Sequence, residues 1–353
     1  MKRLPFLLAG ILVSLPASAQ ADSTGHDLNV GLNFLAHGEL CGGGLPRASA
    51  TAENRSAFIL GRTRLNLDYR QGGWLQAHLV VQNSAIWGMK GNQAINLYEG
   101  WAKLQSRGGL FAQIGRIALS YDDERIIGTN DFANASKSHD ALRFGYEGHG
   151  HKVHAIVAYN QNGENVYSGT YYIGGAQPYK TMQTAWYHYD VPSFPLGASL
   201  LFMNMGLQAG IDGNDGNPPH VEYQQMDGAY LKVDPNYVTV EASYYRQVGK
   251  HVTEFMDGTA IRAWMASALA TIKPSDRYGF QLGYDYLSGD DYVPVIYGGK
   301  LGLPRHEVLG GFTPINGSRT KFYGLLDYFY QSAYSNGFTP GLQNAFAGVF
   351  GNP

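Results

Sequence analysis

The sequence predicts an all-β fold, an antiparallel up-and-down β-barrel that crosses a membrane with its strands. Three observations favour this fold: apolar and polar residues alternate, short and long connections alternate, and the N-terminus has the pattern of an export signal. The alternation of residue type is clearest in residues 56–70, whose odd positions are mostly apolar. The charged residues of this segment all occupy even positions: Arg62, Arg64, Asp68 and Arg70.

Successive side chains of a β-strand point to opposite faces, so residues 56–70 predict one apolar face and one charged face. In a soluble β-sandwich the apolar face would pack in a core, whereas in an outer-membrane barrel it would contact lipid. The composition favours the barrel. Charged residues make up 15% of the chain, against about 25% in average soluble domains, and the 25 tyrosines suit membrane interfaces.

The N-terminus predicts a signal peptide over residues 1–19. Lys2 and Arg3 precede a short apolar run at residues 6–15, and the Ala-Ser-Ala sequence at 17–19 predicts cleavage before Gln20. No later run of 18 or more apolar residues predicts a spanning helix. We therefore expect residues 20–353 to form a single barrel domain. The one cysteine, Cys41, excludes an internal disulfide.

Strand-like segments recur along the whole chain, without a convincing amphipathic helix between them. Tight turns are expected at 71–73, 148–150 and 234–236, and long connections at 85–95, 117–138, 161–178, 206–221 and 288–318. The fifteen predicted strands are 28–39, 56–70, 74–84, 96–105, 110–116, 139–147, 152–160, 179–189, 196–205, 222–233, 237–247, 261–272, 278–287, 321–330 and 342–350. Since single-chain bacterial barrels usually have an even number, we expect a last strand to be lacking here, or one strand to be miscounted.

Several motifs resemble the alginate export (alginate porin-like) family of outer-membrane barrels. They are Gly-Arg at 115–116, Ser-Tyr-Asp-Asp-Glu-Arg at 120–125 and Ser-His-Asp-Ala at 138–141, supported by segments 64–69, 97–102, 287–290 and 321–330. Phe132 departs from the pattern, which often has tryptophan there. The resemblance implies 16–18 strands, a bacterial outer-membrane location, and passive passage of an anionic polysaccharide or small solutes. It implies no cofactor, and it is compatible with a periplasmic export partner.

Charged residues on the predicted inner face are the candidates for pore selectivity, because channels select solutes with rings of charge at a constriction. Cationic and acidic residues are mixed on this face, which favours an electric field across the pore over a uniformly positive pore wall. The alternative is that these charges pair with one another and only keep the interior hydrated. The candidate pore-lining residues are Arg62, Arg64, Asp68, Arg70, Glu99, Lys103, Arg116, Asp122, Asp123, Arg125, Asp140, Arg143 and Lys152.

Two other classes of function remain open at this stage. Ser138, His139 and Asp140 have the residue types of a hydrolase triad, although neighbours on a strand point to opposite faces. Alternatively, the long connection at 290–318 plugs a structural or adhesive barrel. The acidic run at 212–217 lacks the ligand spacing of a calcium loop, so no metal is expected. A chain with 28 acidic and 26 basic residues is not expected to bind nucleic acid; the expected partners are membrane lipid and a carbohydrate or other small solute.

Overall fold

The computed structural model describes residues 9–18, 25–41, 56–90, 95–131, 136–161, 179–209, 220–252, 258–275, 277–289, 295–297, 300–302, 308–318 and 321. In these ranges no helix has the length and apolar character needed to cross a membrane.

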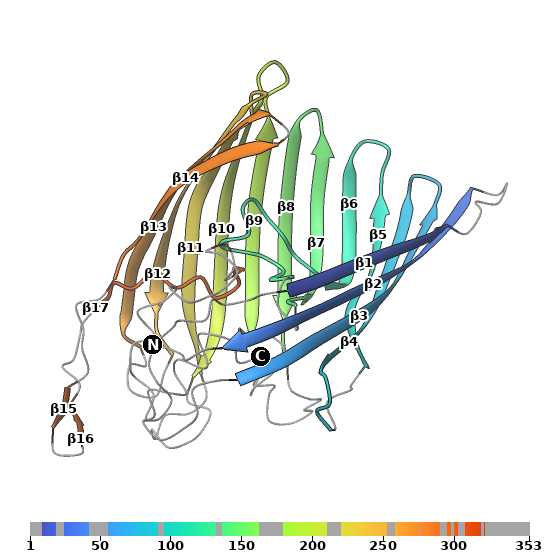
Figure 1. The fold of residues 1–353 in the computed structure, drawn as a ribbon. Coiled ribbons are helices and arrows are strands. Elements are labelled where there is room, and N and C mark those ends of the chain that lie inside the picture. The colour runs from blue at the N-terminus through green and yellow to red at the C-terminus, as the bar shows by residue number, and fades with distance from the viewer. Residues whose placement is uncertain are drawn as a thin grey trace.

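Fourteen strands form one antiparallel sheet in which every strand pairs with its neighbours in the sequence (Figure 1). This confirms the predicted all-β, up-and-down fold, and thirteen of the predicted segments are strands. The strands are β1 (Ala9–Ser18), β2 (His26–Cys41), β3 (Ser56–Gln71), β4 (Leu75–Ile86), β5 (Ile95–Gln105), β6 (Leu110–Ile117), β7 (His139–Gly148), β8 (His151–Tyr159), β9 (Thr181–Asp190), β10 (Leu196–Ala209), β11 (His220–Val233), β12 (Val238–Lys250), β13 (Ala260–Ser275) and β14 (Tyr278–Leu287).

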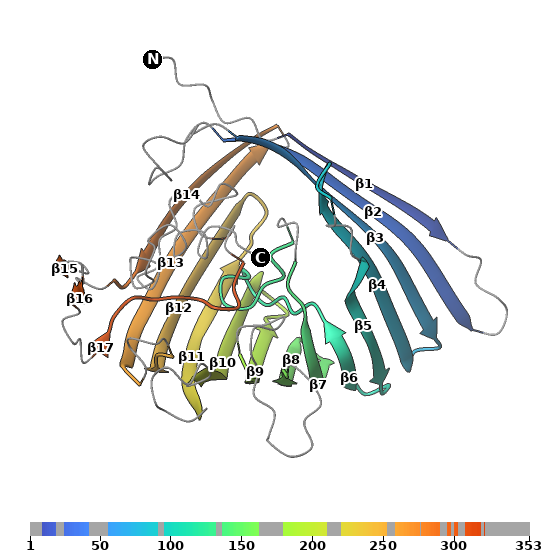
Figure 2. The same cartoon turned by 90° about the horizontal axis from the view of Figure 1, so that it is seen from below.

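The sheet curves into a deep arc whose edge strands are β1 and β14 (Figure 2). Two short strands, β15 (Val295–Tyr297) and β16 (Lys300–Gly302), form a separate hairpin, and β17 (Val308–Leu309) pairs in parallel with β13. The strands predicted at 321–330 and 342–350 lie outside the described residues, apart from Lys321. The total of 16–18 strands, and a missing last strand, therefore stay predictions.

The segment predicted to be a signal peptide overlaps β1, which pairs with β2 from Ala9↔Gly38 to Ser18↔Asn29. Strand pairing in the full-length chain does not test whether residues 1–19 are removed during export. The signal peptide and the single domain over residues 20–353 stay predictions.

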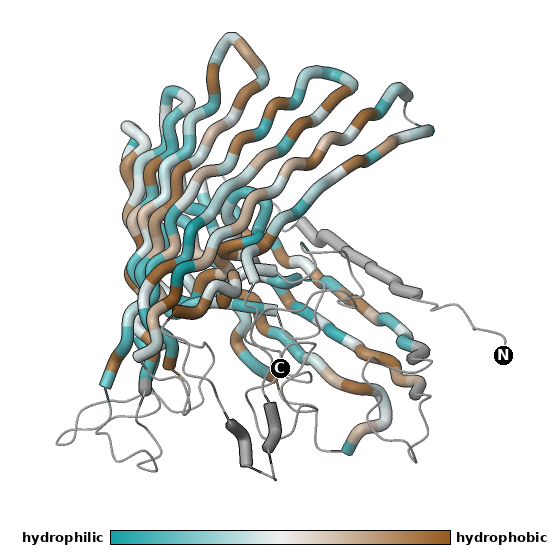
Figure 3. Tube along the Cα trace, turned by 90° about the vertical axis from the view of Figure 1, so that its left-hand side faces the viewer, coloured by the Kyte–Doolittle hydropathy of each residue, from teal (hydrophilic) through white to brown (hydrophobic). Residues whose placement is uncertain are grey.

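The alternation of residue type predicts the two faces of β3 correctly. Arg64 lies opposite Asn33 of β2 and Gln82 of β4, and its guanidinium donates to the Gln82 side chain on the buried, concave side of the sheet. Leu65 points outward and is 42% exposed. The same alternation of hydropathy continues from strand to strand along the sheet (Figure 3). The convex face is thus largely apolar, whereas the concave face carries polar side chains on β3 and β4 and an apolar cluster further along the sheet.

Tight turns and long connections are segregated between the two ends of the sheet, as predicted. The β7–β8 turn has His149 and Gly150 at φ 54° and 81°, and Asn236 in the β11–β12 turn has φ 42°. Positive φ favours glycine and asparagine, which explains these residue choices. The longer connection from β6 to β7 leaves from the opposite end of these strands, and its described residues are 118–131 and 136–138.

Aromatic side chains project from the convex face near both ends of the strands. Tyr237 and Tyr278 lie beside tight turns and are 65% and 69% exposed. Trp264 lies towards the other end of the sheet, where it contacts Tyr244 and Tyr286 with ring centroids 6.0 and 4.6 Å apart. Such belts are typical of membrane interfaces.

Two chain segments fold back onto the concave face: residues 118–131 after β6, and residues 308–318 after β16 (Figure 2). Leu119, Ile127 and Phe312 from these segments are almost completely buried in a cluster with inward side chains of the sheet. The surface of the sheet against which these segments pack is rich in methionine. The five methionines, all 0–1% exposed, are Met182, Met203, Met205, Met226 and Met265. The core of this protein therefore lies inside the arc.

Candidate functional site

The candidate site is the concave side of the sheet, where residues 118–131 form a loop that we call the inner loop. Its start follows β6, its acidic residues reach β9 and β10, and its end contacts β3. The inner loop narrows the space enclosed by the arc, which is the role expected of a constriction.

Arg62 and Arg64 hold the end of the inner loop against β3. Arg62 donates to the carbonyl oxygen of Asp131 over 2.7 Å, and Arg64 donates to Oδ1 of the same residue over 2.6 Å. Both guanidinium groups also reach Ser136 Oγ, at 2.9 and 2.7 Å. The two arginines are only 2% and 8% exposed. They therefore act as anchors for the loop as well as positive charges of the wall.

A β-bulge adds a side chain to this basic corner that the sequence pattern placed on the other face. The register of β4 against β5 shifts between Val80 and Val81, which turns Tyr98 inward. Tyr98 is 6% exposed, and the guanidinium carbon of Arg64 lies 3.8 Å from the centre of its ring. Strict alternation along the predicted strand 96–105 places Tyr98 on the apolar face with Ala102 and Leu104. The bulge, which that alternation does not indicate, makes this placement wrong.

Lys103 of β5 and Arg143 of β7 continue the row of cations that begins with Arg62 and Arg64 on β3, and we call this row the basic wall. Lys103 Nζ lies 4.1 Å from the centre of the Phe111 ring, and Arg143 lies over the same ring at 5.5 Å. Arg143 also donates to Gln113 and to the Tyr121 hydroxyl of the inner loop. Both cations are partly buried, so Phe111 and Gln113 fix their positions on the wall.

The acidic residues of the inner loop face the opposite part of the sheet. Asp122 accepts from Ser199 Oγ of β10 over 2.5 Å and from the Trp186 indole of β9 over 3.2 Å. Burial raises the pKa of Asp122. It also raises the pKa of Asp123 to about 6, against the opposing charge of Arg125. These carboxylates place negative charge across the arc from the arginines of β3.

Arg125 crosses to the far edge of the sheet. Its guanidinium donates to both carboxylate oxygens of Asp285 on β14, over 2.6 and 3.2 Å, and to the carbonyl oxygen of Lys321 over 3.2 Å. Arg125 and Asp285 side chains are only 10% and 16% exposed. The inner loop is therefore tied to β3 at one end and to β14 in its middle.

Residues 308–318 contact the inner loop and the residues that follow it. Lys137 donates to the carbonyl oxygens of Ile315 and Gly317, and Ser318 donates to Glu124 over 2.8 Å. Asn316 is fully buried and its amide contacts three methionine sulfur atoms, the nearest being Met205 at 3.1 Å. The sequence marked this long connection as a plug candidate but did not predict these contacts.

Four further predicted residues lie on the concave face, and one of them, Glu99, contacts the start of the inner loop. Asp68 accepts from His78 over 2.6 Å, and Glu99 accepts from the Trp101 indole and from the backbone of Ala118. Lys152 pairs with Asp190 at 3.1 Å. Arg70 is exposed near the β3–β4 turn. Asp68, Arg70 and Lys152 therefore contribute charge to the wall away from the inner loop, whereas Glu99 accepts from the first residue of that loop.

Two predicted residues, Arg116 and Asp140, are not on the concave face, and their assignment to the pore lining is wrong. They lie opposite each other in the β6–β7 register, in step with outward residues such as Ile114 and Phe144. The guanidinium of Arg116 donates to both carboxylate oxygens of Asp140, over 2.9 and 2.7 Å. Position beside a charged loop misled the prediction, whereas strand parity gives the correct face.

The residues of the hydrolase alternative do not converge. His139 is fully buried and hydrogen-bonded to the Tyr179 hydroxyl at 2.6 Å, while Asp140 points to the other face and pairs with Arg116. The distances that a triad requires are therefore absent from this segment. Within the described part of the chain, no three His, Cys, Asp or Glu residues cluster as metal ligands. The run at 212–217 lies outside the described residues.

The chain resembles outer-membrane channel proteins of solved structure. No protein-family model matches it, and no curated protein matches its sequence. It is similar to OprB of Pseudomonas putida, with 14% identity, a TM-score of 0.42, and coverage of 70% of this chain and 75% of OprB. It is also similar to OccK2 (OpdF) of Pseudomonas aeruginosa, with 14% identity, a TM-score of 0.48, and coverage of 75% of this chain and 65% of OccK2. For the outer membrane channel DcaP of Acinetobacter baumannii the identity is 13% and the TM-score 0.47, with coverage of 76% of this chain and 80% of DcaP. These values describe a distant likeness, so the fold is established by the strand pairing itself.

Proposed function

We propose that this protein is a bacterial outer-membrane channel for the passive passage of small solutes. The observation that carries the proposal is the pair of opposite faces on one curved sheet. The convex face exposes large apolar side chains, such as Leu200, Phe280 and Leu282 at 59%, 68% and 80%. Soluble proteins rarely expose apolar patches beyond a few hundred Å², whereas lipid covers such a face in a transmembrane barrel.

The concave face carries charged side chains around the inner loop, beside the apolar cluster that packs beneath this loop, and we assign the path for solutes to the charged part. Most of its charged side chains are paired or hydrogen-bonded, and the inner loop spans it without following the wall. In outer-membrane barrels the tight turns face the periplasm and the long connections face outward. We place the β7–β8 and β11–β12 turns on the periplasmic side accordingly.

The charge distribution favours anionic or carbohydrate solutes. Arg62, Arg64, Lys103 and Arg143 come from β3, β5 and β7, whereas Asp122 and its neighbour reach towards β9 and β10. Guanidinium groups bind carboxylates through paired hydrogen bonds. Passage of an alginate-like polymer, which the motifs at 115–141 suggest, is the narrower form of this proposal.

Single-channel recording in planar bilayers tests the proposal. The purified protein is expected to give stepwise currents, and anionic oligosaccharides are expected to reduce them more than neutral ones of equal length. Protein that inserts into bilayers and gives no current would contradict the proposal.

A plugged barrel is the second candidate, and the ties of the inner loop to β3, β14 and residues 315–318 favour it. It predicts an inserted protein without current in the wild type. Current that appears only after Arg125→Ala would identify the plugged form, since that substitution removes the central tie.

Asp123 gives the channel an expected pH dependence. With a folded-state pKa of about 6 in place of 3.8, Asp123 is mostly neutral at pH 5 and ionised at pH 7.5. Cation preference, measured as the reversal potential in a salt gradient, is expected to rise over this interval, and Asp123→Asn is expected to remove that part of the rise. The raised pKa also makes folding stability depend on pH. Because the native state binds this proton more tightly than the unfolded state, the free energy of unfolding falls as pH rises from about 4 to above 6. An unchanged profile in Asp123→Asn would contradict this assignment.

Export is expected to remove residues 1–19. Mass spectrometry of the protein isolated from outer membranes is expected to give a chain that begins at Gln20. A mature chain that retains Ala9–Ser18 would instead support β1 as a permanent strand.

A further inference from the structure

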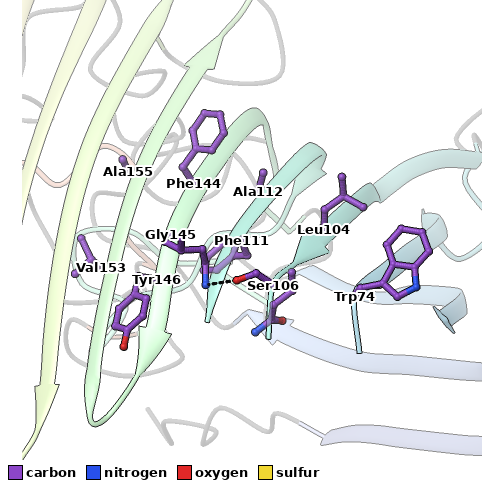
Figure 4. A pocket seen from close by; sticks show the side chains of 12 residues that line it. Trp74, Leu104, Ser106, Phe111, Ala112, Phe144, Gly145, Tyr146, Val153 and Ala155 are labelled. Atoms are coloured by element: carbon purple, nitrogen blue, oxygen red, sulfur yellow. Dashed lines mark hydrogen bonds between the residues drawn. The ribbon is translucent and has the colours of Figure 1, made fainter. Parts of the chain in front are cut away.

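A depression of about 790 Å³ lies on the convex face, over β5 to β8 and close to their tight turns (Figure 4). Its walls are almost entirely apolar and include Trp74, Leu104, Phe144 and Val153. The volume falls in the range of small-molecule pockets, ~300–1,000 Å³. We call this depression the outer groove.

Short side chains between tall neighbours form the outer groove. Ala112 pairs with Leu104 on one side and Phe144 on the other, and Ala155 pairs with Phe144 from β8. Leu110, 63% exposed, and Phe144, 51% exposed, rise beside these alanines. The outer groove therefore crosses the outer surface of β5 to β8 and does not open into the lumen.

A cation follows directly in the chain after a residue that lines the outer groove. Arg107 lies in the β5–β6 turn, next to Ser106, which lines the groove and accepts from the Leu110 amide. Arg107 is exposed and makes no hydrogen bond or ion pair with any residue in the described part of the chain. Trp74, whose carbonyl accepts from the Gln105 amide, stands at the same end of the groove.

We propose that the outer groove binds one phospholipid of the periplasmic leaflet, with an acyl chain between Leu104 and Phe144 and the phosphate on Arg107. The apolar lining matches the chain, the unpaired guanidinium matches the anionic headgroup, and Trp74 matches the polar–apolar boundary between them. The proposal rests on the outer-membrane location proposed above. It does not depend on conduction.

Native mass spectrometry tests the site. Protein stripped of lipid in mild detergent and then mixed with phosphatidylglycerol is expected to retain one lipid per chain. Arg107→Ala is expected to lower the retained fraction at least fivefold. Arg277→Ala is the matched control, because Arg277 is also exposed beside a tight turn but lies outside the groove. No retained lipid in the wild type, or equal losses in both variants, would overturn the proposal.

A larger side chain inside the outer groove provides a second, independent test of lipid binding. Ala112→Leu is expected to abolish retention, while Ala242→Leu is expected to leave it unchanged. Ala242 is an outward alanine on β12 that pairs with Leu231 and Ala268, away from the groove. A two-chain species that Ala112→Leu dissociates would overturn the lipid assignment in favour of a subunit interface. Since the readout is bound mass, a protein that fails to conduct but retains lipid separates this proposal from the channel.

Discussion

Replacing Arg62 and Arg64 together by glutamine is expected to lower the preference for anions about five- to tenfold. Both guanidinium groups lie in the basic corner beside Asp131, with exposures of 2% and 8%. A change of ~1.4 kcal/mol in the barrier for an ion shifts its permeability about tenfold, and charges a few ångströms apart near a protein surface interact by ~4 kcal/mol. Glutamine keeps hydrogen-bonding capacity towards Asp131 and Ser136, so the loop should stay in place.

The reversal potential in a potassium chloride gradient measures this preference. Arg70→Gln is the control, because Arg70 shares the strand and the face but is exposed near the β3–β4 turn. If the control shifts the reversal potential as far as the double variant, the constriction does not lie at the inner loop. An unchanged potential in the double variant would show that these arginines only hold the loop.

Arg125→Ala is expected to free the inner loop from β14 and to raise single-channel conductance about twofold. The substitution leaves Asp285 buried without its cation, and removing one partner of a buried ion pair costs about 3–5 kcal/mol. The inner loop can relieve this cost by moving towards the basic wall and admitting water to Asp285. Both consequences widen the path through the arc.

Lys152→Ala is the matched control for Arg125→Ala. Lys152 pairs with Asp190 on the same concave face, but both side chains are about half exposed, at 43% and 56%. Such pairs contribute about 0–1 kcal/mol, so conductance and thermal stability should stay close to those of the wild type. Equal conductance in the wild type and Arg125→Ala would mean that the contacts with β3 and with residues 308–318 are sufficient to hold the loop.

The strands were largely predictable because the alternation of side chains repeats a simple two-residue period. Arg62, Arg64 and Leu65 were assigned to their correct faces by that period alone. Tyr98 was not, because a bulge adds a residue to one strand without any mark in the composition. Asp140 was assigned to the pore from its neighbourhood in the sequence, although its own parity with Leu142 indicated the outer face.

The interior contacts were much less predictable than the wall. Asp285, which holds Arg125, is 160 positions away in the chain, and Lys137 reaches residues 178 and 180 positions away. Such pairs depend on how two long connections fold back into the arc, and no periodicity encodes that path. The residue types along the strands correctly indicated a charged interior. Which cation pairs with which acid became clear only from the fold.

The Arg116–Asp140 pair has a consequence for the thickness of the membrane around the protein. On β7, Asp140 and Tyr146 both point outward, and the six residue steps from one to the other span about 20 Å along the strand. Strand tilt of about 40° shortens this to roughly 15 Å of height, less than the ~25 Å apolar band of typical barrels. β6 has only eight residues and presents Leu110, Ala112 and Ile114 before Arg116 interrupts its apolar row. In the membrane channel proposed above, the bilayer would therefore thin beside β6 and β7, which would favour short or disordered lipid chains there.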